Sequence, residues 1–295
     1  NSAMNSFTIK DLESLSGIKA HTIRIWEQRY SFLKPQRTDT NIRYYSSDEL
    51  KTILNIALLN KYGFKISHID KMNQAEISQK LVSLTDFQAQ QEKLVNDLIG
   101  NMIDMDVDRF EATLDRYIHA RGIERTINQL IFPYLERIGI LWQTNHINPG
   151  QEHLVTNIIR QKLIVGIENA SPIINSSKTC ILFLPESEYH ELGLLYIYFL
   201  LKSKGLTVLY LGANVPAKDL IYVTENKKPH FVYTHITCIP GNFKLEKYLN
   251  HLREKISQVP IIVSGQLAQI HQKLVSPGID FKRSMSEVLD FTTSL

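Results

Sequence analysis

Cysteine is scarce in this chain, and long apolar runs are missing from it. Only two cysteines, Cys180 and Cys238, occur among the 295 residues. Two cysteines so far apart form no disulfide framework and have no spacing typical of a metal site. The longest fully apolar stretch, residues 194–201, has 8 residues, whereas a membrane-spanning helix needs about 20. These shortages argue against a disulfide-stapled secreted fold and predict a cytoplasmic protein with no membrane contact.

The charge of the chain is small in total but unevenly placed. The formal net charge is +3, and residues 1–75 hold 11 Lys and Arg against seven Asp and Glu. The remainder of the chain is therefore almost neutral. A basic head on a neutral body is typical of a DNA-binding module joined to another domain. The length suits two or three domains, and the 43% of apolar residues is that of a globular protein.

Residues 5–75 predict a winged helix-turn-helix domain. A first apolar pattern with helical spacing ends at Gly17, and a second helix fits residues 20–28. The segment 41–45 is aromatic and β-prone, and the residues from Ser47 form a helix-start signal. Two helices joined by a tight turn and followed by a short ribbon are the order of elements in this domain type.

Residues 76–170 predict a four-helix bundle. Their apolar positions keep a period near 3.6, for example over 81–102 and again over 127–141. Pro133 and Pro149 mark either breaks or first-turn positions of these helices. Packing four such helices together is a common way to bury their apolar faces.

Residues 178–295 alternate between strand and helix patterns. This alternation predicts a Rossmann-like α/β domain with a doubly wound parallel sheet. Ligands of such sheets bind outside the carboxyl ends of the strands. Strands are expected at residues 180–184, 207–211, 231–237 and 260–264, and helices at 193–204 and from Ala217.

The run of residues 22–30, together with Pro35, Arg37 and residues 41–46, resembles the MerR family of regulators. The Trp-Glu-x-Arg-Tyr form at 26–30 resembles the subgroup that is fused to cobalamin-binding domains. The likeness covers about 70 residues in the right order and implies binding to double-stranded promoter DNA as a homodimer or homotetramer, because such heads read paired half-sites. Trp26 is expected in the core, and the expected DNA-binding residues are Lys19, Thr22, Arg24, Arg29, Arg37, Arg43 and Tyr44.

The segment Glu188-Tyr-His190-Glu-Leu-Gly193 follows the first predicted strand of the α/β domain. It resembles the Asp/Glu-x-His-x-x-Gly motif of cobalamin-binding domains. The resemblance implies that His190 is the lower ligand of cobalt, that Glu188 fixes the imidazole, and that Gly193 lets the corrin approach the backbone. Such an assignment is chemically sound, since a carboxylate that bonds to the other ring nitrogen fixes the tautomer of a metal-binding imidazole.

Two further positions of the same resemblance fall on later strands. The family's Ser-x-Leu motif corresponds to Thr234-His-Ile here, and its Gly-Gly pair corresponds to Ser264-Gly265. The resemblance makes Thr234, Ser264 and Gly265 expected cofactor-binding residues. The additional Cβ of Ser264 is expected to crowd the nucleotide tail that lies between sheet and helix.

Trp142, Glu152 and His153 in the helical region resemble the residues with which photoreceptor regulators of the CarH/LitR type cap adenosylcobalamin. An indole can stack on an adenosyl group, and a carboxylate can accept from ribose hydroxyls. In that family a His that captures cobalt after illumination often follows the Trp, whereas here Gln143 stands in its place. The sequence therefore predicts a cofactor site and leaves the response to light open.

The predicted protein is a DNA-binding regulator controlled by a cobalamin, and it is not an enzyme. One alternative is a ligand-independent regulator whose altered cobalamin-binding fold serves only oligomerisation or partner binding. A further alternative is an enzyme such as a corrinoid methyltransferase or mutase subunit. The DNA-binding head argues against an enzyme, as does the lack of a second catalytic constellation.

Overall fold

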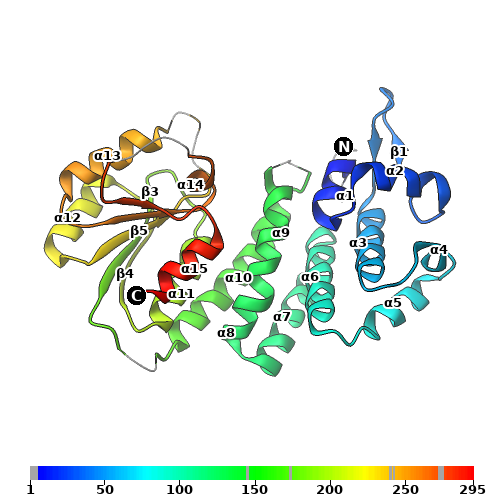
Figure 1. The fold of residues 1–295 in the computed structure, drawn as a ribbon, viewed down its shortest axis with the longest axis horizontal. Helices are drawn as coiled ribbons and strands as arrows, with labels where there is room; N and C mark the ends of the chain where they lie inside the picture. Colours follow the sequence, from blue (N-terminus) through cyan, green and yellow to red (C-terminus); the bar gives the residue numbers. More distant parts are fainter. Residues whose placement is uncertain (1–5, 144–145, 173–174, 239–240, 242, 272–275) are drawn as a thin grey trace. The chain divides into compact units, whose positions relative to one another are not determined.

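The chain forms two compact units, residues 1–159 and residues 160–295, which are described separately. The computed structural model describes residues 6–143, 146–172, 175–238, 241, 243–271 and 276–295. Figure 1 shows the helical first unit and the α/β second unit. In the described residues no helix is both long enough and apolar enough to cross a membrane.

The first unit begins with the predicted helix-turn-helix region. Helix α2 follows α1 after a tight turn, and the antiparallel strands β1 and β2 form the wing. The Thr8 side chain accepts from the Asp11 N–H and starts α1, while Gly17 ends it with a φ of 74°, where glycine is strongly preferred. The elements are α1 (Ile9–Ser16), α2 (Ala20–Arg29), β1 (Gln36–Arg37), β2 (Arg43–Tyr44) and α3 (Ser47–Lys61).

The rest of the first unit is helical, as the 3.6-residue period predicted. Two short helices lead into the longer helices that pack together in the bundle. The elements are α4 (Ile66–Ile69), α5 (Gln74–Val82), α6 (Phe87–Ile103), α7 (Val107–Arg121), α8 (Ile123–Thr126), the π-helical turn η1 (Ile127–Ile131), α9 (Phe132–Gln143) and α10 (Pro149–Asn169), which continues into the second unit.

The two prolines of the bundle act differently. Pro149 is the first residue of α10, where its missing N–H costs nothing. Pro133 lies near the start of α9, directly after the π-helical turn, in which the N–H of Phe132 bonds to the carbonyl of Ile127. Proline removes one helical hydrogen bond, and the change to a wider turn accommodates this loss without ending the helix.

The second unit is a five-stranded parallel sheet with helices on both faces, which confirms the predicted doubly wound fold. The strand order is β4-β3-β5-β6-β7. The strands are β3 (Thr179–Pro185), β4 (Thr207–Val215), β5 (Phe231–His235), β6 (Ile261–Ser264) and β7 (Ile279–Phe281), and the helices are α11 (Leu192–Ser203), α12 (Ala217–Lys227), α13 (Leu245–Lys255), α14 (Gln266–Ile270) and α15 (Met285–Thr293).

Alternation along β3 divides the core of the second unit into two layers. Ile181 and Phe183 pack on the side of α12 and α13, whereas Leu182 and Leu184 pack on the side of α11 and α15. Strands buried on both faces read as continuous apolar runs, which explains the run at 180–184. The chain leaves β3 toward β4 and returns to β5 on the other side, so the sheet reverses its winding between β3 and β5.

Candidate functional site

The DNA-binding candidates of α2 lie at its start and along its exposed side. Lys19 is the residue before the first turn, with a side chain that is 73% exposed and Nζ 3.3 Å from a Glu13 oxygen. Thr22 is half-buried, and Arg24 and Arg29 are exposed. Long, solvated cations of this kind suit phosphate contacts.

The wing is held together by its own polar contacts. The Arg37 guanidinium donates to Oδ1 of Asn41 over 2.8 Å, and Asn41 has a φ of 64°, which a turn residue of its type tolerates. The Tyr44 hydroxyl donates to the side chain of Gln36. Arg37 and Tyr44 are therefore positioned by contacts across the ribbon.

Arg43 joins the wing to α2. Its Nε lies 3.0 Å from Oε2 of Glu27, whose side chain is only 9% exposed. The Tyr45 hydroxyl donates to the other oxygen of Glu27, and burial together with Glu27 raises the pKa of Tyr45. Arg43 thus has a structural partner that the sequence did not reveal, in addition to the DNA contact expected of it.

The carboxyl ends of β3 and β5 meet where the sheet reverses its winding. Open parallel sheets bind their ligands in the crevice at such a point. The chain places Glu188, His190 and Gly193 after β3, while His235 ends β5 and Ser264 ends β6. The predicted motif and the later strand ends therefore belong to one region of the second unit.

Glu188 is fully buried and accepts four hydrogen bonds. Its Oε1 accepts from the His190 backbone N–H over 2.9 Å and lies 2.7 Å from His190 Nδ1. Its Oε2 accepts from the N–H groups of Thr237 over 2.9 Å and Cys238 over 2.7 Å. Burial alone would raise the pKa of Glu188, but the hydrogen bonds from His190 and Cys238 outweigh it and lower that pKa. The carboxylate is therefore ionised.

The Glu188 contact decides how His190 can act. Because Nδ1 bonds to the carboxylate, Nε2 is the nitrogen that would coordinate a metal. The His190 side chain is 50% exposed. An exposed imidazole with a buried carboxylate partner fits a transition-metal ion such as cobalt.

His235 occupies the space beside Gly193. A Cβ added to Gly193 would lie 2.3 Å from Cδ2 of His235. The His235 Nδ1 lies 2.8 Å from the Ser264 hydroxyl, which also accepts from the Tyr233 hydroxyl over 2.8 Å. Burial lowers the pKa of His235 to about 4, so the ring is neutral at neutral pH. His235 is not among the predicted site residues, because the Ser-x-Leu resemblance leaves the position between Thr234 and Ile236 unspecified.

The other predicted strand-end residues have different surroundings. The Thr234 hydroxyl is buried and has no hydrogen-bond partner among the described residues. Gly265 has a φ of 94°, and a Cβ there would lie 2.4 Å from the carbonyl oxygen of Ile236. Gly265 is therefore required by the close approach of two backbone segments, while Thr234 has unused hydrogen-bonding capacity in the region of the crevice.

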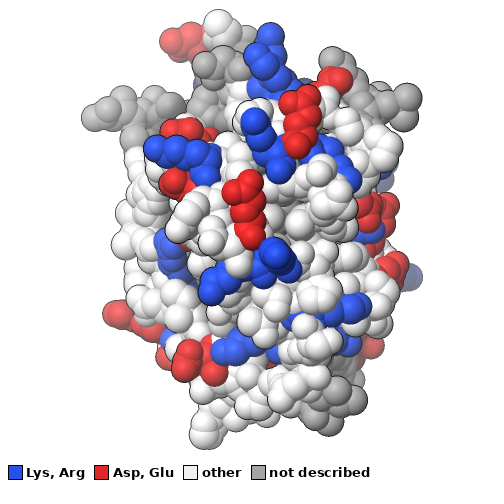
Figure 2. All heavy atoms as spheres, turned by 90° about the vertical axis from the view of Figure 1, so that its left-hand side faces the viewer, with Lys and Arg blue, Asp and Glu red and all other residues white. Residues whose placement is uncertain are grey.

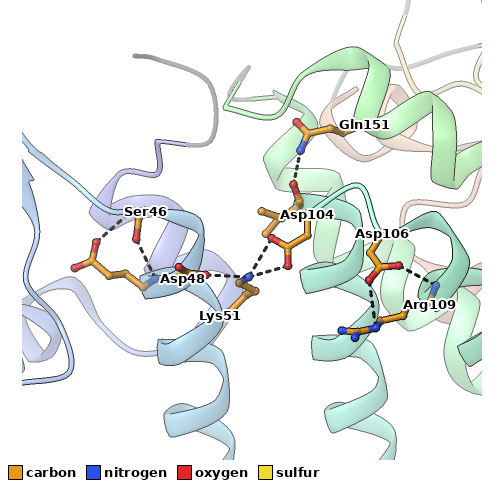
Figure 3. A network of polar contacts seen from close by, with 9 residues as sticks. Ser46, Asp48, Lys51, Asp104, Asp106, Arg109 and Gln151 are labelled. Carbon is orange, nitrogen blue, oxygen red and sulfur yellow. Dashed lines mark hydrogen bonds and ion pairs between the residues drawn. The ribbon is translucent and has the colours of Figure 1, made fainter. Parts of the chain in front are cut away.

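The predicted contacts from the bundle lie in the first unit. Glu152 is half-buried and His153 is exposed, in the first turn of α10. Their neighbour Gln151 is buried and donates to the carbonyl of Ile103 over 2.7 Å, which fastens the start of α10 to α6 (Figure 3). The side chains of Trp142 and Gln143 lie outside the described part of the structure.

Polar contacts also tie the DNA-binding head to the bundle within the first unit. Lys51 of α3 donates to Asp104 at the end of α6 over 2.7 Å (Figure 3). Arg137 of α9 donates to the carbonyl of Leu15 in α1 and, over 2.7 Å, to Oδ1 of Asn96. Head and bundle are thus joined by side chains as well as by the chain itself.

Comparison with known proteins agrees with this arrangement. Residues 7–76 match the model of the MerR HTH family regulatory proteins, and residues 94–165 and 179–285 match two models described as B12 binding domains. The chain shares its fold with the Methanosarcina barkeri monomethylamine corrinoid protein, at 12% identity and a TM-score of 0.51 over 69% of this chain and 99% of that one.

Two regulators of Myxococcus xanthus match almost end to end. The HTH-type transcriptional repressor CarH is 27% identical over 92% of this chain and 92% of its own length. The HTH-type transcriptional repressor CarA is 25% identical over 95% of this chain and 94% of its own. This chain therefore combines a MerR HTH domain with B12 binding domains and is homologous to the transcriptional repressors CarH and CarA over 92–95% of its length.

Proposed function

We propose that this protein binds promoter DNA through its N-terminal head, and that adenosylcobalamin held by His190 controls its assembly or its DNA affinity. The observation that carries the proposal is the contact between Glu188 and His190, because it presents one defined imidazole nitrogen to a metal ion. The matches to two B12 binding domain models support the class of cofactor.

The DNA part of the proposal rests on the head. Its proposed contacts are Lys19, Thr22, Arg24, Arg29, Arg37, Arg43 and Tyr44, and a homodimer or homotetramer in the cytoplasm would present two heads to paired half-sites. We also propose domain limits of 5–75, 76–170 and 178–295, which the matched regions 7–76, 94–165 and 179–285 support.

Control of DNA binding by a cofactor requires two states of the protein. A cofactor shifts their populations only as far as it binds one state better than the other. His190 would hold the metal, Glu188 would keep the imidazole oriented, and Trp142, Glu152 and His153 are further proposed contacts from the bundle. Adenosylcobalamin would supply a cobalt–carbon bond that light can break, and Gln143 makes the response to light the part of the proposal that most needs testing.

The first test is corrin retention. Protein incubated with adenosylcobalamin in the dark and then desalted is expected to keep a corrin absorption spectrum. His190→Ala is expected to lose affinity at least tenfold, while His251→Ala, an exposed histidine of α13, serves as the matched control. Loss of the spectrum from the unmodified protein, or equal retention by His190→Ala, would contradict the proposed site.

Glu188→Gln tests the orienting role. The amide keeps the size of the side chain but replaces an acceptor-only carboxylate by a group that also donates. Removal of the second-layer partner of a metal-binding His typically weakens metal binding about 10–100-fold. Cofactor titration should show a loss in that range, with His190 still present. An unchanged affinity would mean that Glu188 serves only the fold.

Illumination and DNA binding complete the test. The elution volume and operator affinity of the loaded protein are expected to change when light removes the adenosyl group. Equal assembly and DNA affinity with and without the cofactor would favour the second candidate, a ligand-independent regulator that uses the altered fold for oligomerisation. Ser264, in place of a glycine, is the observation that favours this candidate.

A further inference from the structure

A side chain of the second unit lies where ligands of such a sheet are expected to enter. The His235 ring ends β5, at the point where the sheet reverses its winding, and rests directly against Gly193. Ligands of parallel sheets enter the crevice at this point. A ligand group that enters here therefore competes with the imidazole of His235 for the same space.

Neighbouring groups hold this imidazole in place. Ser264 bonds to its Nδ1 over 2.8 Å and is itself held by the hydroxyl of Tyr233. Tyr233 is fully buried and packs against Phe291 of α15. Moving the ring would break the bond to Ser264 and leave a buried hydroxyl with fewer partners, which costs free energy.

We propose that His235 is a specificity-determining residue that sets how large a group a corrinoid can place in this crevice. The inference rests on the proposed corrinoid function. If His190 coordinates cobalt, the lower face of the corrin is turned toward the second unit, and so is the nucleotide that cobalamin carries on that face. Cobinamide, a corrinoid without the nucleotide, places no such group there and leaves His235 undisturbed.

The consequence is a defined ranking of ligands. Cobalamin must displace the imidazole of His235, whereas cobinamide need not. Shortening the side chain should thus improve cobalamin binding more than cobinamide binding. The hydroxyl of Thr234, which has no partner among the described residues, is available to hydrogen-bond a group that enters this region once the space is open.

The experiment compares two ligands on three variants of the full chain. Dissociation constants of cobalamin and cobinamide are measured by absorption titration for the unmodified protein, His235→Ala, His235→Phe and the control His251→Ala. The ratio of the cobalamin constant to the cobinamide constant should fall at least tenfold in His235→Ala. It should stay high in His235→Phe, which fills the space without bonding to Ser264. Circular dichroism checks that each variant is folded.

Each outcome decides the inference. A ratio that is unchanged in His235→Ala overturns it, while cobalamin binding that still depends on His190 leaves the proposed function intact. Cobalamin binding that is stronger in His235→Ala than in the unmodified protein, with cobinamide binding unchanged, supports it, since the ring is then the obstacle. If none of the folded proteins binds either corrinoid, both the inference and the proposed function fail.

Discussion

The DNA-binding head and the crevice of the α/β unit use polar side chains in opposite ways. Arg24 and Arg29 extend from α2 into solvent, whereas Glu188 is fully buried and accepts four hydrogen bonds. Phosphates approach a protein from solvent, so their partners can be long and mobile. A metal-binding imidazole must be oriented in advance, so its partner is fixed inside the protein.

The head and the second unit also differ in how their surface charges are arranged. On the face of the second unit shown in Figure 2, basic and acidic side chains are interspersed. Helix α13 alone carries Glu246, Lys247, Arg253 and Glu254. Mixed charges of this kind give no extended attraction for nucleic acid, whereas α2 and the wing present several cations together. Substitutions of the solvated arginines of α2 should change DNA binding alone, and substitutions in the buried region around His235 should change folding as well.

Gly265→Ala should lower the stability of the protein more than any other substitution proposed here. The new Cβ would lie 2.4 Å from the Ile236 carbonyl oxygen at a φ of 94°, so the strained backbone and the clash together should cost about 4 kcal/mol. Urea unfolding should show this loss, while DNA binding at low urea is retained. The control Gly139→Ala, where no atom lies within 4 Å of the new Cβ, should be neutral or stabilising. Equal stability of the two variants would show that the backbone at Gly265 has room for a Cβ beside the carbonyl of Ile236.

Stability should also depend on pH through the buried ring of His235. The pKa of His235 is lowered to about 4 in the folded protein, against about 6.5 in an unfolded chain. The unfolded chain therefore binds this proton first, and the free energy of unfolding should fall by about 2 kcal/mol between pH 6.5 and pH 5. The lowered pKa of Glu188 adds a loss at still lower pH. The His235→Ala variant should lose less free energy of unfolding between pH 6.5 and pH 5. If its stability falls with pH as steeply as that of the unmodified protein, His235 is not a buried neutral ring.

The smallest effect is expected in the head. Arg24→Ala should weaken operator binding about fivefold and reduce the salt slope by about 1, with unfolding unchanged within about 0.5 kcal/mol. Arg43→Ala should lower DNA affinity and also stability by about 1 kcal/mol, because Glu27 loses one of its two partners and keeps only Tyr45. Salt-dependent titrations and urea unfolding of both variants measure this. Stability that is unaffected in Arg43→Ala would assign that arginine to DNA alone.

Local patterns predicted more of the fold than of the site. The helices that end at Gly17 and begin at Ser47, and the strand run at 180–184, follow from spacing and capping, and the structure has them. The motif at 188–193 also predicted which residues follow β3. No element was predicted at the positions of α13, α14, β7 and α15. Strand β7 has 3 residues and α14 has 5, which is too few for a periodic apolar pattern.

The missed contacts join residues far apart in sequence. Glu27 and Arg43 are brought together by the wing, and Gly193 and His235 by the neighbouring positions of β3 and β5. Only the strand order makes His235 a neighbour of Gly193, and no spacing rule contains that order. The motif resemblance even hid His235, because it treats that position as unspecified.

The contacts of Arg137 and Lys51 bear on how a promoter must be built. Because these contacts fasten each head rigidly to its bundle, two heads in a dimer joined through the bundles would keep a fixed distance and orientation. Half-sites of helix-turn-helix proteins lie about 34–36 Å apart, or multiples of this distance. One inserted base pair both lengthens the operator and turns one half-site about the helix axis. A dimer with fixed heads could follow neither change. The spacer length of the operator should therefore affect binding as strongly as its base sequence does.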